Sequence, residues 1–299
     1  AKILPIDKAI EYMKYMATKS YLKKGQDIVD LNHKAIDAGK DALHLVTIPA
    51  AWAKAGETPA PAPVTGKRAD LVKFVNEIVL PVNGMKGDSL TVKTFADMAD
   101  GQFPQGAAAY EKRGVAVMVP EWIADNCIQC NNCAFVCPHA CIRPFAMTEE
   151  EAKAAPADTK FAPKPVAKTN YKFTMAVSAL DCMGCTLCVK ACPVTAKALK
   201  DAMVVATANN PDNPKAAAKE AAKAAVAKSA IVMVPQEKGL YQQAAYNYAV
   251  ENVAEKPELI SVTVKGSQFK QPLLEFSGSC AGCAETSYAR LITQRFGER

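Results

Sequence analysis

Apolar residues recur at three- and four-residue steps in residues 1–55, a spacing that predicts two helices. In the second of these helices one apolar stripe is predicted, made of Ile28, Leu31, Ala35, Ala38, Ala42 and Leu45. A further short helix is predicted from Ala69 to Leu80, with apolar residues near one face. These are Leu71, Val72, Val75, Ile78 and Val79.

Short apolar runs beyond this point predict strands, because they are bounded by proline or polar residues. The predicted strands are Gly114–Val119, ending at Pro120, then Tyr171–Val177, Met203–Thr207 and Ile231–Val234. An acidic helix start is predicted at Thr148–Glu151, and the alanine- and lysine-rich segment from Lys215 to Lys228 has strong helix propensity. Near the end of the chain, a helix is predicted whose apolar face is Tyr288, Leu291, Ile292 and Phe296.

The composition indicates a globular protein and argues against a nucleic-acid-binding or membrane protein. The 299 residues are 50% hydrophobic and 22% charged, which is typical of a globular protein. The net charge of +6 comes from scattered lysines, so nucleic-acid binding is poorly supported, whereas docking of an acidic electron carrier and a plain solvated surface fit about equally. No stretch approaches the roughly 20 apolar residues of a membrane span, and the first residues lack a signal-peptide layout. We therefore expect a cytoplasmic protein without membrane contact.

Eight of the eleven cysteines form two copies of the pattern C-x2-C-x2-C-x3-C-P. The first copy is Cys127, Cys130, Cys133 and Cys137, and the second is Cys182, Cys185, Cys188 and Cys192. Each cysteine of the first copy lies 55 residues before its counterpart (182 − 127 = 192 − 137 = 55), which indicates an internal duplication with an insert.

This spacing predicts two [4Fe–4S] clusters. In two-cluster bacterial ferredoxins the fourth cysteine of each motif ligates the other cluster. Cluster one is then predicted on Cys127, Cys130, Cys133 and Cys192, and cluster two on Cys182, Cys185, Cys188 and Cys137. The apolar or small residues between the ligands suit a cluster pocket, and Gly184 permits close approach of backbone to sulfur.

Two other interpretations of these cysteines are weaker. Zinc sites also use C-x2-C pairs, but zinc explains neither the third C-x2 step nor the proline after each fourth cysteine. Disulfides suit small secreted chains rather than this one. Cys141 lies outside the pattern and is predicted to be a buried spare thiol, and His139 a surface residue or a support for a ligand.

A third cysteine pair, Cys280 and Cys283, lies in the segment S-G-S-C-A-G-C-A-E-T. Two cysteines cannot complete a tetrahedral metal site alone. The pair could supply half of the ligands of a third cluster, a redox dithiol or two buried thiols, and the C-x2-C spacing does not decide among them.

Several segments together resemble the pyruvate:ferredoxin oxidoreductase family over nearly the whole chain. The segments that carry the resemblance are G-A-A-A-Y-E-K-R-G-V-A-V (106–117), C-I-Q-C-N-N-C-A-F-V-C-P-H-A (127–140), C-M-G-C-T-L-C-V-K-A-C-P (182–193) and G-S-Q-F-K-Q-P-L-L-E-F-S-G-S-C-A-G-C-A-E-T (266–286). The chain departs from the family at Cys141, Ser279 and Ala284, small changes that leave the predicted ligands intact.

The resemblance implies oxidative decarboxylation of pyruvate on thiamine diphosphate with Mg²⁺, transfer of the acetyl group to coenzyme A, and electron flow through three [4Fe–4S] clusters to ferredoxin or flavodoxin. It implies that Cys280 and Cys283 are half of the third ligand set and that Glu285 and Thr286 lie near the thiamine site, with no catalytic role assigned to either. It also implies a homodimer. No G-D-G segment for Mg²⁺ and diphosphate occurs, so these residues alone are predicted to carry electrons rather than the carbon chemistry.

The predicted fold class is α+β: a bacterial-type 2[4Fe–4S] ferredoxin-like domain with insertions, flanked by partial α/β domains. The expected divisions are 1–55, the last helices of a gamma-like domain; 56–120, a proline-rich connector and a small EKR domain; 121–235, the ferredoxin-like domain; and 236–299, a linker and the start of a thiamine-diphosphate domain. We expect the chain to be part of a larger polypeptide, because no further sequence covers the apolar face of its last helix. The competing functions are another 2-oxoacid:ferredoxin oxidoreductase and a non-enzymatic two-cluster carrier.

Overall fold

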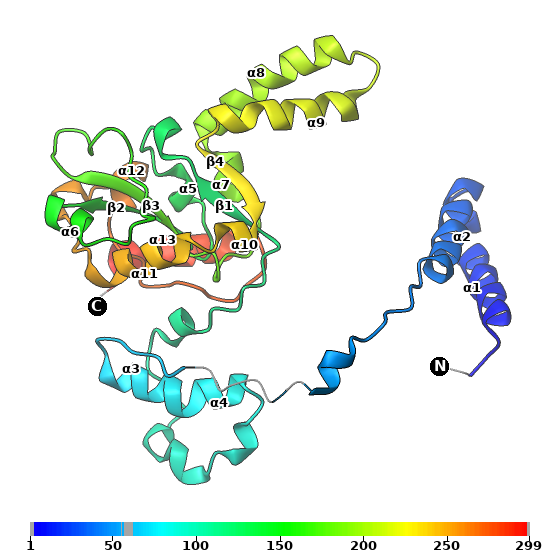
Figure 1. The fold of residues 1–299 in the computed structure, drawn as a ribbon, viewed down its shortest axis with the longest axis horizontal. Helices are drawn as coiled ribbons and strands as arrows, with labels where there is room; N and C mark the ends of the chain where they lie inside the picture. The colour runs from blue at the N-terminus through cyan, green and yellow to red at the C-terminus, as the bar shows by residue number, and fades with distance from the viewer. Residues whose placement is uncertain (1–2, 55, 57–61, 298–299) are drawn as a thin grey trace. The chain divides into compact units, whose positions relative to one another are not determined.

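The computed structural model describes residues 3–54, 56 and 62–297 (Figure 1). The chain forms two compact units, Ala1–Ala60 and Pro61–Arg299. Part of the predicted connector, residues 57–61, lies outside the described residues. The expected divisions at 120/121 and 235/236 both fall inside the second unit.

The first unit contains the two predicted helices, α1 (Ile6–Tyr21) and α2 (Gln26–Asp41), joined by η1 (Leu22–Lys24) and followed by η2 (Ala50–Lys54). The predicted stripe on α2 is wrong. Leu31 is 66% exposed and Leu45 lies beyond the helix end, whereas Val29 is buried. The two helices also contact each other through polar pairs, Thr18 with His33 at 2.9 Å and Lys14 with Asp37 at 2.7 Å. The spacing of apolar residues cannot predict a contact face made of polar residues.

The second unit begins with one continuous helical rod made of α3 (Ala69–Phe74), η3 (Val75–Val79) and α4 (Leu80–Asn83). The predicted inward residues Leu71, Val75 and Ile78 are buried, which confirms this helix. Its middle is a wide π-type turn in which the Leu80 N–H bonds to the Val75 carbonyl, five residues back. Such a turn accommodates Pro81, which has no N–H to donate. Three short 3-10 turns follow, η4 (Gly87–Ser89), η5 (Val92–Met98) and η6 (Ala107–Tyr110).

Two antiparallel two-stranded sheets form the core around the cysteine motifs. The outer strands β1 (Met118–Trp122) and β4 (Ile231–Pro235) pair with Trp122 opposite Ile231. The inner strands β2 (Ile142–Met147) and β3 (Lys172–Val177) pair with Ile142 opposite Val177. The first motif therefore lies between β1 and β2, and the second between β3 and β4, so strand pairing brings both motifs to one core.

Strands β3 and β4 were predicted correctly, whereas the other two were not. β1 does not stop at Pro120 but runs through it, because one side of each strand in a two-stranded sheet is free and a proline there costs no ladder bond. β2 was missed because Arg143 and Pro144 interrupt its apolar run, yet all six of its residues are buried.

The predicted strand Met203–Thr207 is wrong, because these residues belong to α8 (Pro193–Asn209). α8 forms a helical hairpin with α9 (Pro214–Ala225), which is extended by η8 (Val226–Lys228) and agrees with the predicted alanine-rich helix (Figure 1). Ala206 packs against Ala217 and Ala221, so close helix contact outweighs the β propensity of two valines.

The remaining elements are short helices around the core. They are η7 (Ala124–Asn126), α5 (Asn132–Phe135), α6 (Glu149–Lys153), α7 (Leu187–Ala191), α10 (Gln236–Gly239), α11 (Gln242–Asn252), η9 (Pro257–Leu259), α12 (Val264–Ser267) and α13 (Ala284–Phe296). The predicted helix start at Thr148 is confirmed by a capping box with Glu151. Described residues outside the core form no strand, so the α/β flanks stay a prediction. In the described ranges, no helix has the length and apolar character to cross a membrane.

Candidate metal centres

The two cysteine motifs adopt the same backbone course, offset by 55 residues. Gln129 and Gly184, the second residues after the first cysteines, have φ of +57° and +68°. Asn131 and Thr186, two residues later, have φ of +62° and +65° and immediately precede the matching helices α5 and α7. Two left-handed residues at matched positions curl each motif, so the duplication in sequence is a duplication in structure.

This curl aims backbone donors at sulfur. The N–H groups of Gln129 and Gly184 each lie 3.3 Å from the Sγ of the cysteine two residues before. Position 184 requires glycine, because a Cβ there would lie 3.2 Å from the Met118 carbonyl oxygen. Its φ is also one that residues with a side chain avoid. Backbone N–H···S bonds of this kind are what an anionic iron–sulfur cluster requires from its pocket.

The eight motif cysteines line two separate cavities, and each cavity takes three cysteines from one motif and one from the other. The first cavity is lined by Cys127, Cys130, Cys133 and Cys192 together with Trp122, Ile128, Asn131, Met175, Val194, Ala230 and Ile231. The second is lined by Cys182, Cys185, Cys188 and Cys137 together with Cys141, Pro120, Pro138, His139, Ile142, Met183, Thr186, Leu187 and Met233. These are the two groupings that the sequence predicted.

The thiolate charges acting on Cys133 and on Cys182 come from cysteines of the same cavity in each case. Burial raises the pKa of the Cys133 thiol, and the neighbouring thiolates that add to this are Cys127, Cys130 and Cys192. Burial likewise raises the pKa of Cys182 to about 12, with further contributions from Cys137 and Cys185. Buried thiolates that repel one another need cationic metal in their midst to remain ionised.

A buried N–H in the first cavity suits a sulfur acceptor. Trp122 is 2% exposed, and its Nε1 makes no hydrogen bond among the described residues. The indole lines this cavity beside Cys127, and its N–H lowers the pKa of that thiol, although burial raises the pKa more. A cluster sulfur or a cluster-bound thiolate would satisfy this N–H.

Within the described residues, no three His, Cys, Asp or Glu side chains gather around a position for one metal ion.

Cys141 and His139 lie directly behind the first motif. Cys141 is buried, its thiol donates to the Asp181 carbonyl at 3.0 Å, and its N–H lies 3.3 Å from Cys137 Sγ. It remains a spare thiol at the wall of the second cavity. The interpretation of His139 as a surface residue is wrong, because it is 2% exposed and its ring contacts Ser277 Oγ at 3.2 Å and the Cys280 carbonyl at 3.4 Å.

The third cysteine pair lies beside the second cavity. A Cβ on Gly282 would lie 3.6 Å from the Cys185 Cβ, and His139 reaches the Cys280 carbonyl from the other side. Cys280 is exposed and Cys283 partly exposed, which excludes the interpretation as two buried thiols. Cys283 precedes α13, and the backbone N–H of Thr286 lowers the pKa of the Cys283 thiol.

Helix α13 packs with its polar side inward, and the described residues leave its predicted apolar face largely uncovered. Tyr288, Ile292 and Phe296 are 70%, 59% and 81% exposed, whereas Arg290 and Gln294 are buried. No periodicity of apolar residues could have found this face, since the inward residues are a charged and an amide side chain that bond to backbone carbonyls.

A buried ion pair joins the segment E-K-R to the second motif. Lys112 lies 2.5 Å from Asp181, the residue before Cys182, and the Asp181 side chain is 3% exposed. Lys112 Nζ also lies 4.9 Å from the ring centre of Phe276, four residues before Cys280. Sequence reasoning missed this pair, because its two residues lie 69 positions apart.

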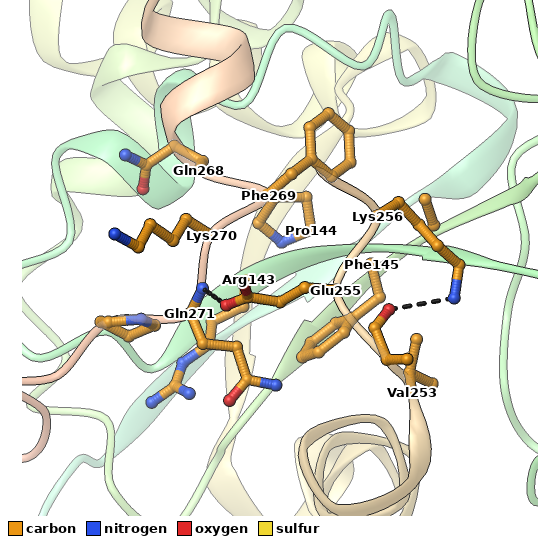
Figure 2. Close-up of a pocket in the computed structure, with 13 residues that line it drawn as sticks. Arg143, Pro144, Phe145, Val253, Glu255, Lys256, Gln268, Phe269, Lys270 and Gln271 are labelled. Atoms are coloured by element: carbon orange, nitrogen blue, oxygen red, sulfur yellow. Dashed lines mark hydrogen bonds between the residues drawn. The ribbon is translucent and has the colours of Figure 1, made fainter. Parts of the chain in front are cut away.

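The hollow drawn in Figure 2 shares no lining residue with these cavities and has no cysteine in its wall. Its lining comes from β2, the segment after α11 and the segment after α12. There the Gln271 N–H donates to Glu255 at 2.7 Å and Lys256 Nζ donates to the Ala254 carbonyl at 3.0 Å. The first of these bonds ties the segment after α12 to the segment after α11.

Comparison with known proteins finds two matching domain models and several similar oxidoreductases. Residues 126–196 match the model of a 4Fe-4S dicluster domain, and residues 60–116 match EKR, a domain of unknown function. The chain is 41% identical over 300 residues to the pyruvate-flavodoxin oxidoreductase of Enterobacter agglomerans and 42% identical over 299 residues to that of Klebsiella pneumoniae. It is 40% identical over 302 residues to the pyruvate:ferredoxin oxidoreductase of Moorella thermoacetica.

The chain corresponds to a segment of these oxidoreductases. The alignments cover 100% of the chain and 22% of each relative, so the chain spans about a fifth of their length. The dicluster match contains all eight cysteines of the two motifs.

Proposed function

We propose that the chain is the electron-transfer segment of a pyruvate:ferredoxin or pyruvate:flavodoxin oxidoreductase. Cys127, Cys130, Cys133 and Cys192 hold cluster one, and Cys182, Cys185, Cys188 and Cys137 hold cluster two. When bound, [4Fe–4S] clusters supply single-electron transfer. The observation that carries the proposal is the crosswise grouping of the eight cysteines around two cavities, in a chain 40–42% identical to such enzymes along its whole length.

Contacts between the cysteine sites support an order. The Cys280–Cys283 segment contacts the site of cluster two through Gly282 and His139. The two main sites adjoin each other, since the charges acting on Cys188 include Cys133 as well as the cysteines of its own cavity. Cys280 and Cys283 are therefore proposed as half of a third ligand set, with cluster two nearer to it and cluster one farther.

The remaining domains of the enzyme supply the carbon chemistry in this proposal. They hold thiamine diphosphate and Mg²⁺, act on pyruvate and coenzyme A, and complete the third ligand set, with Glu285 close to the thiamine site. The electron acceptor is ferredoxin or flavodoxin, and the enzyme is a cytoplasmic homodimer. The names of the relatives support the substrate and the acceptor.

The test uses the full-length polypeptide that contains this segment, purified without oxygen. Pyruvate- and coenzyme A-dependent reduction of a viologen dye, with about twelve iron and twelve acid-labile sulfide atoms per chain, is the expected result. Turnover with a different 2-oxo acid would reassign the substrate. About eight iron atoms without turnover would indicate a two-cluster carrier, and zinc without sulfide would refute the proposal.

A further inference from the structure

Arg290 is a buried cation behind the first cysteine motif, contributed by a helix more than 150 residues away in sequence. It is 2% exposed, and α13 places it against the end of α5. Its Nη2 donates to the carbonyl oxygens of Phe135 at 2.6 Å and Ala134 at 3.1 Å. The guanidinium therefore binds backbone between Cys133 and Cys137, and Cys137, a proposed ligand of cluster two, follows Phe135 by two residues.

The hydrogen bonds of Arg290 leave its charge unbalanced. Among the described residues it makes four, to the two carbonyls and to the amide oxygens of Gln268 at 3.2 Å and Gln294 at 3.4 Å. All four acceptors are neutral, and Nε has no acceptor. Burying a cation without a counter-charge is costly. Burial lowers the pKa of Arg290 and the nearby Arg143 adds to this effect, whereas the Cys137 thiolate raises it.

Other cations near this site differ from Arg290 because each has its own carboxylate. Lys112 pairs with Asp181, and Arg143 pairs with Glu275. Each of these cations has a carboxylate as counter-charge, although Arg143 still acts on Arg290 and lowers its pKa. Arg290 has no carboxylate partner among the described residues.

We infer that Arg290 is a positioning residue that balances the negative charge of cluster two and raises its reduction potential above that of the same cluster without the cation. This inference rests on the proposed function, because it requires a cluster on Cys137. A nearby positive charge stabilises the reduced form, which carries one more negative charge, and net charge is one of the determinants of cluster potential. The guanidinium thus makes cluster two a better acceptor from the site of Cys280 and Cys283.

The experiment is an EPR-monitored redox titration of the full-length enzyme carrying Arg290→Gln, Arg290→Lys or Arg295→Gln. Arg290→Gln is expected to shift one midpoint potential to a more negative value, and Cys137→Ser is expected to alter the EPR signal of that same cluster. Arg290→Lys keeps the charge and is expected to keep the potential. Arg295→Gln makes the same charge change in the last turn of the same helix and is expected to shift none.

Unchanged potentials in Arg290→Gln, with full iron content, would overturn the inference while leaving the proposed function intact. A wild-type enzyme without clusters would instead refute the proposed function. If Arg290→Gln fails to assemble, Arg290→Lys decides alone: a retained potential supports the role of charge, and a negative shift in that variant contradicts it.

Discussion

At the scale of single residues, the surroundings of the cavities include a few buried hydrogen-bond donors and charges that lie outside the cysteine motifs. The cysteine spacing predicted which sulfurs belong together, and the structure groups them in that way. It did not predict Trp122, Lys112 or Arg290, whose positions follow from packing. Their ligand-supporting roles can be tested one side chain at a time.

Trp122→Phe is expected to shift the reduction potential of cluster one to a more negative value. Phenylalanine keeps an aromatic ring against Phe173, whose centre lies 6.0 Å from that of Trp122, but removes the buried N–H. Loss of a hydrogen bond to cluster sulfur destabilises the reduced form. A redox titration followed by EPR measures this, with cluster two as the control in the same sample. Equal shifts of both clusters would argue against a local N–H···S bond.

Lys112→Met is expected to destabilise the folded protein by about 3 kcal/mol, because it leaves the buried Asp181 carboxylate without its cation. Its neighbour provides the control. Arg113 pairs with Glu111 at 2.6 Å but is 62% exposed, so Arg113→Met is expected to cost less than about 1 kcal/mol. Chemical denaturation of both variants gives the comparison, and similar losses would show that the burial of Asp181 is not the cause.

At the scale of elements, local pattern determined helices better than strands. The rod that begins with α3, the capped start of α6 and the alanine-rich α9 follow from propensity, capping and spacing within a few residues. β2 escaped detection, and part of α8 was predicted as a strand, because strand and helix packing are decided by a partner element. For the same reason the inward face of α13 is polar: its partners are carbonyl groups of α5.

Gly184→Ala tests the curl of the second motif. Alanine at φ +68°, with its Cβ 3.2 Å from the Met118 carbonyl oxygen, is expected to cost about 1–2 kcal/mol and to lower the iron content of the purified enzyme. Gly39 is the matched control, because it lies in α2 with open space around its Cβ position. Gly39→Ala is expected to be neutral or slightly stabilising. Full iron content in Gly184→Ala would show that the tight curl is not required for cluster binding.

At the scale of the whole molecule, the second compact unit brings the EKR segment, the two motifs and the third cysteine pair into one body. Lys112 contacts the residue before the second motif and a ring near Cys280, and His139 links the first motif to the Cys280 carbonyl. The EKR segment therefore belongs structurally to the metal centres rather than to a separate module.

Replacing both Cys280 and Cys283 by serine in the full-length enzyme is expected to lower the iron content from about twelve to about eight atoms per chain. Pyruvate-dependent dye reduction should fall at the same time, while the EPR signals of clusters one and two persist. Cys141→Ser is the control, because Cys141 is a spare thiol and all clusters should remain. An iron content that is unchanged in the double variant, or reduced in the control, would contradict the assignment of ligands.

The spacing of the eight cysteines in the sequence was enough to predict iron–sulfur sites, because ligand spacing and the backbone curl of each motif depend on neighbours within a few residues. It also predicted the crosswise sets, because the repeat reproduces a known two-cluster pattern. Tertiary structure decided which charges and donors surround those sets, which cavity lies beside Cys280, and that α13 turns Arg290 inward. These features depend on contacts between residues up to 156 positions apart, whose pairing no local pattern encodes.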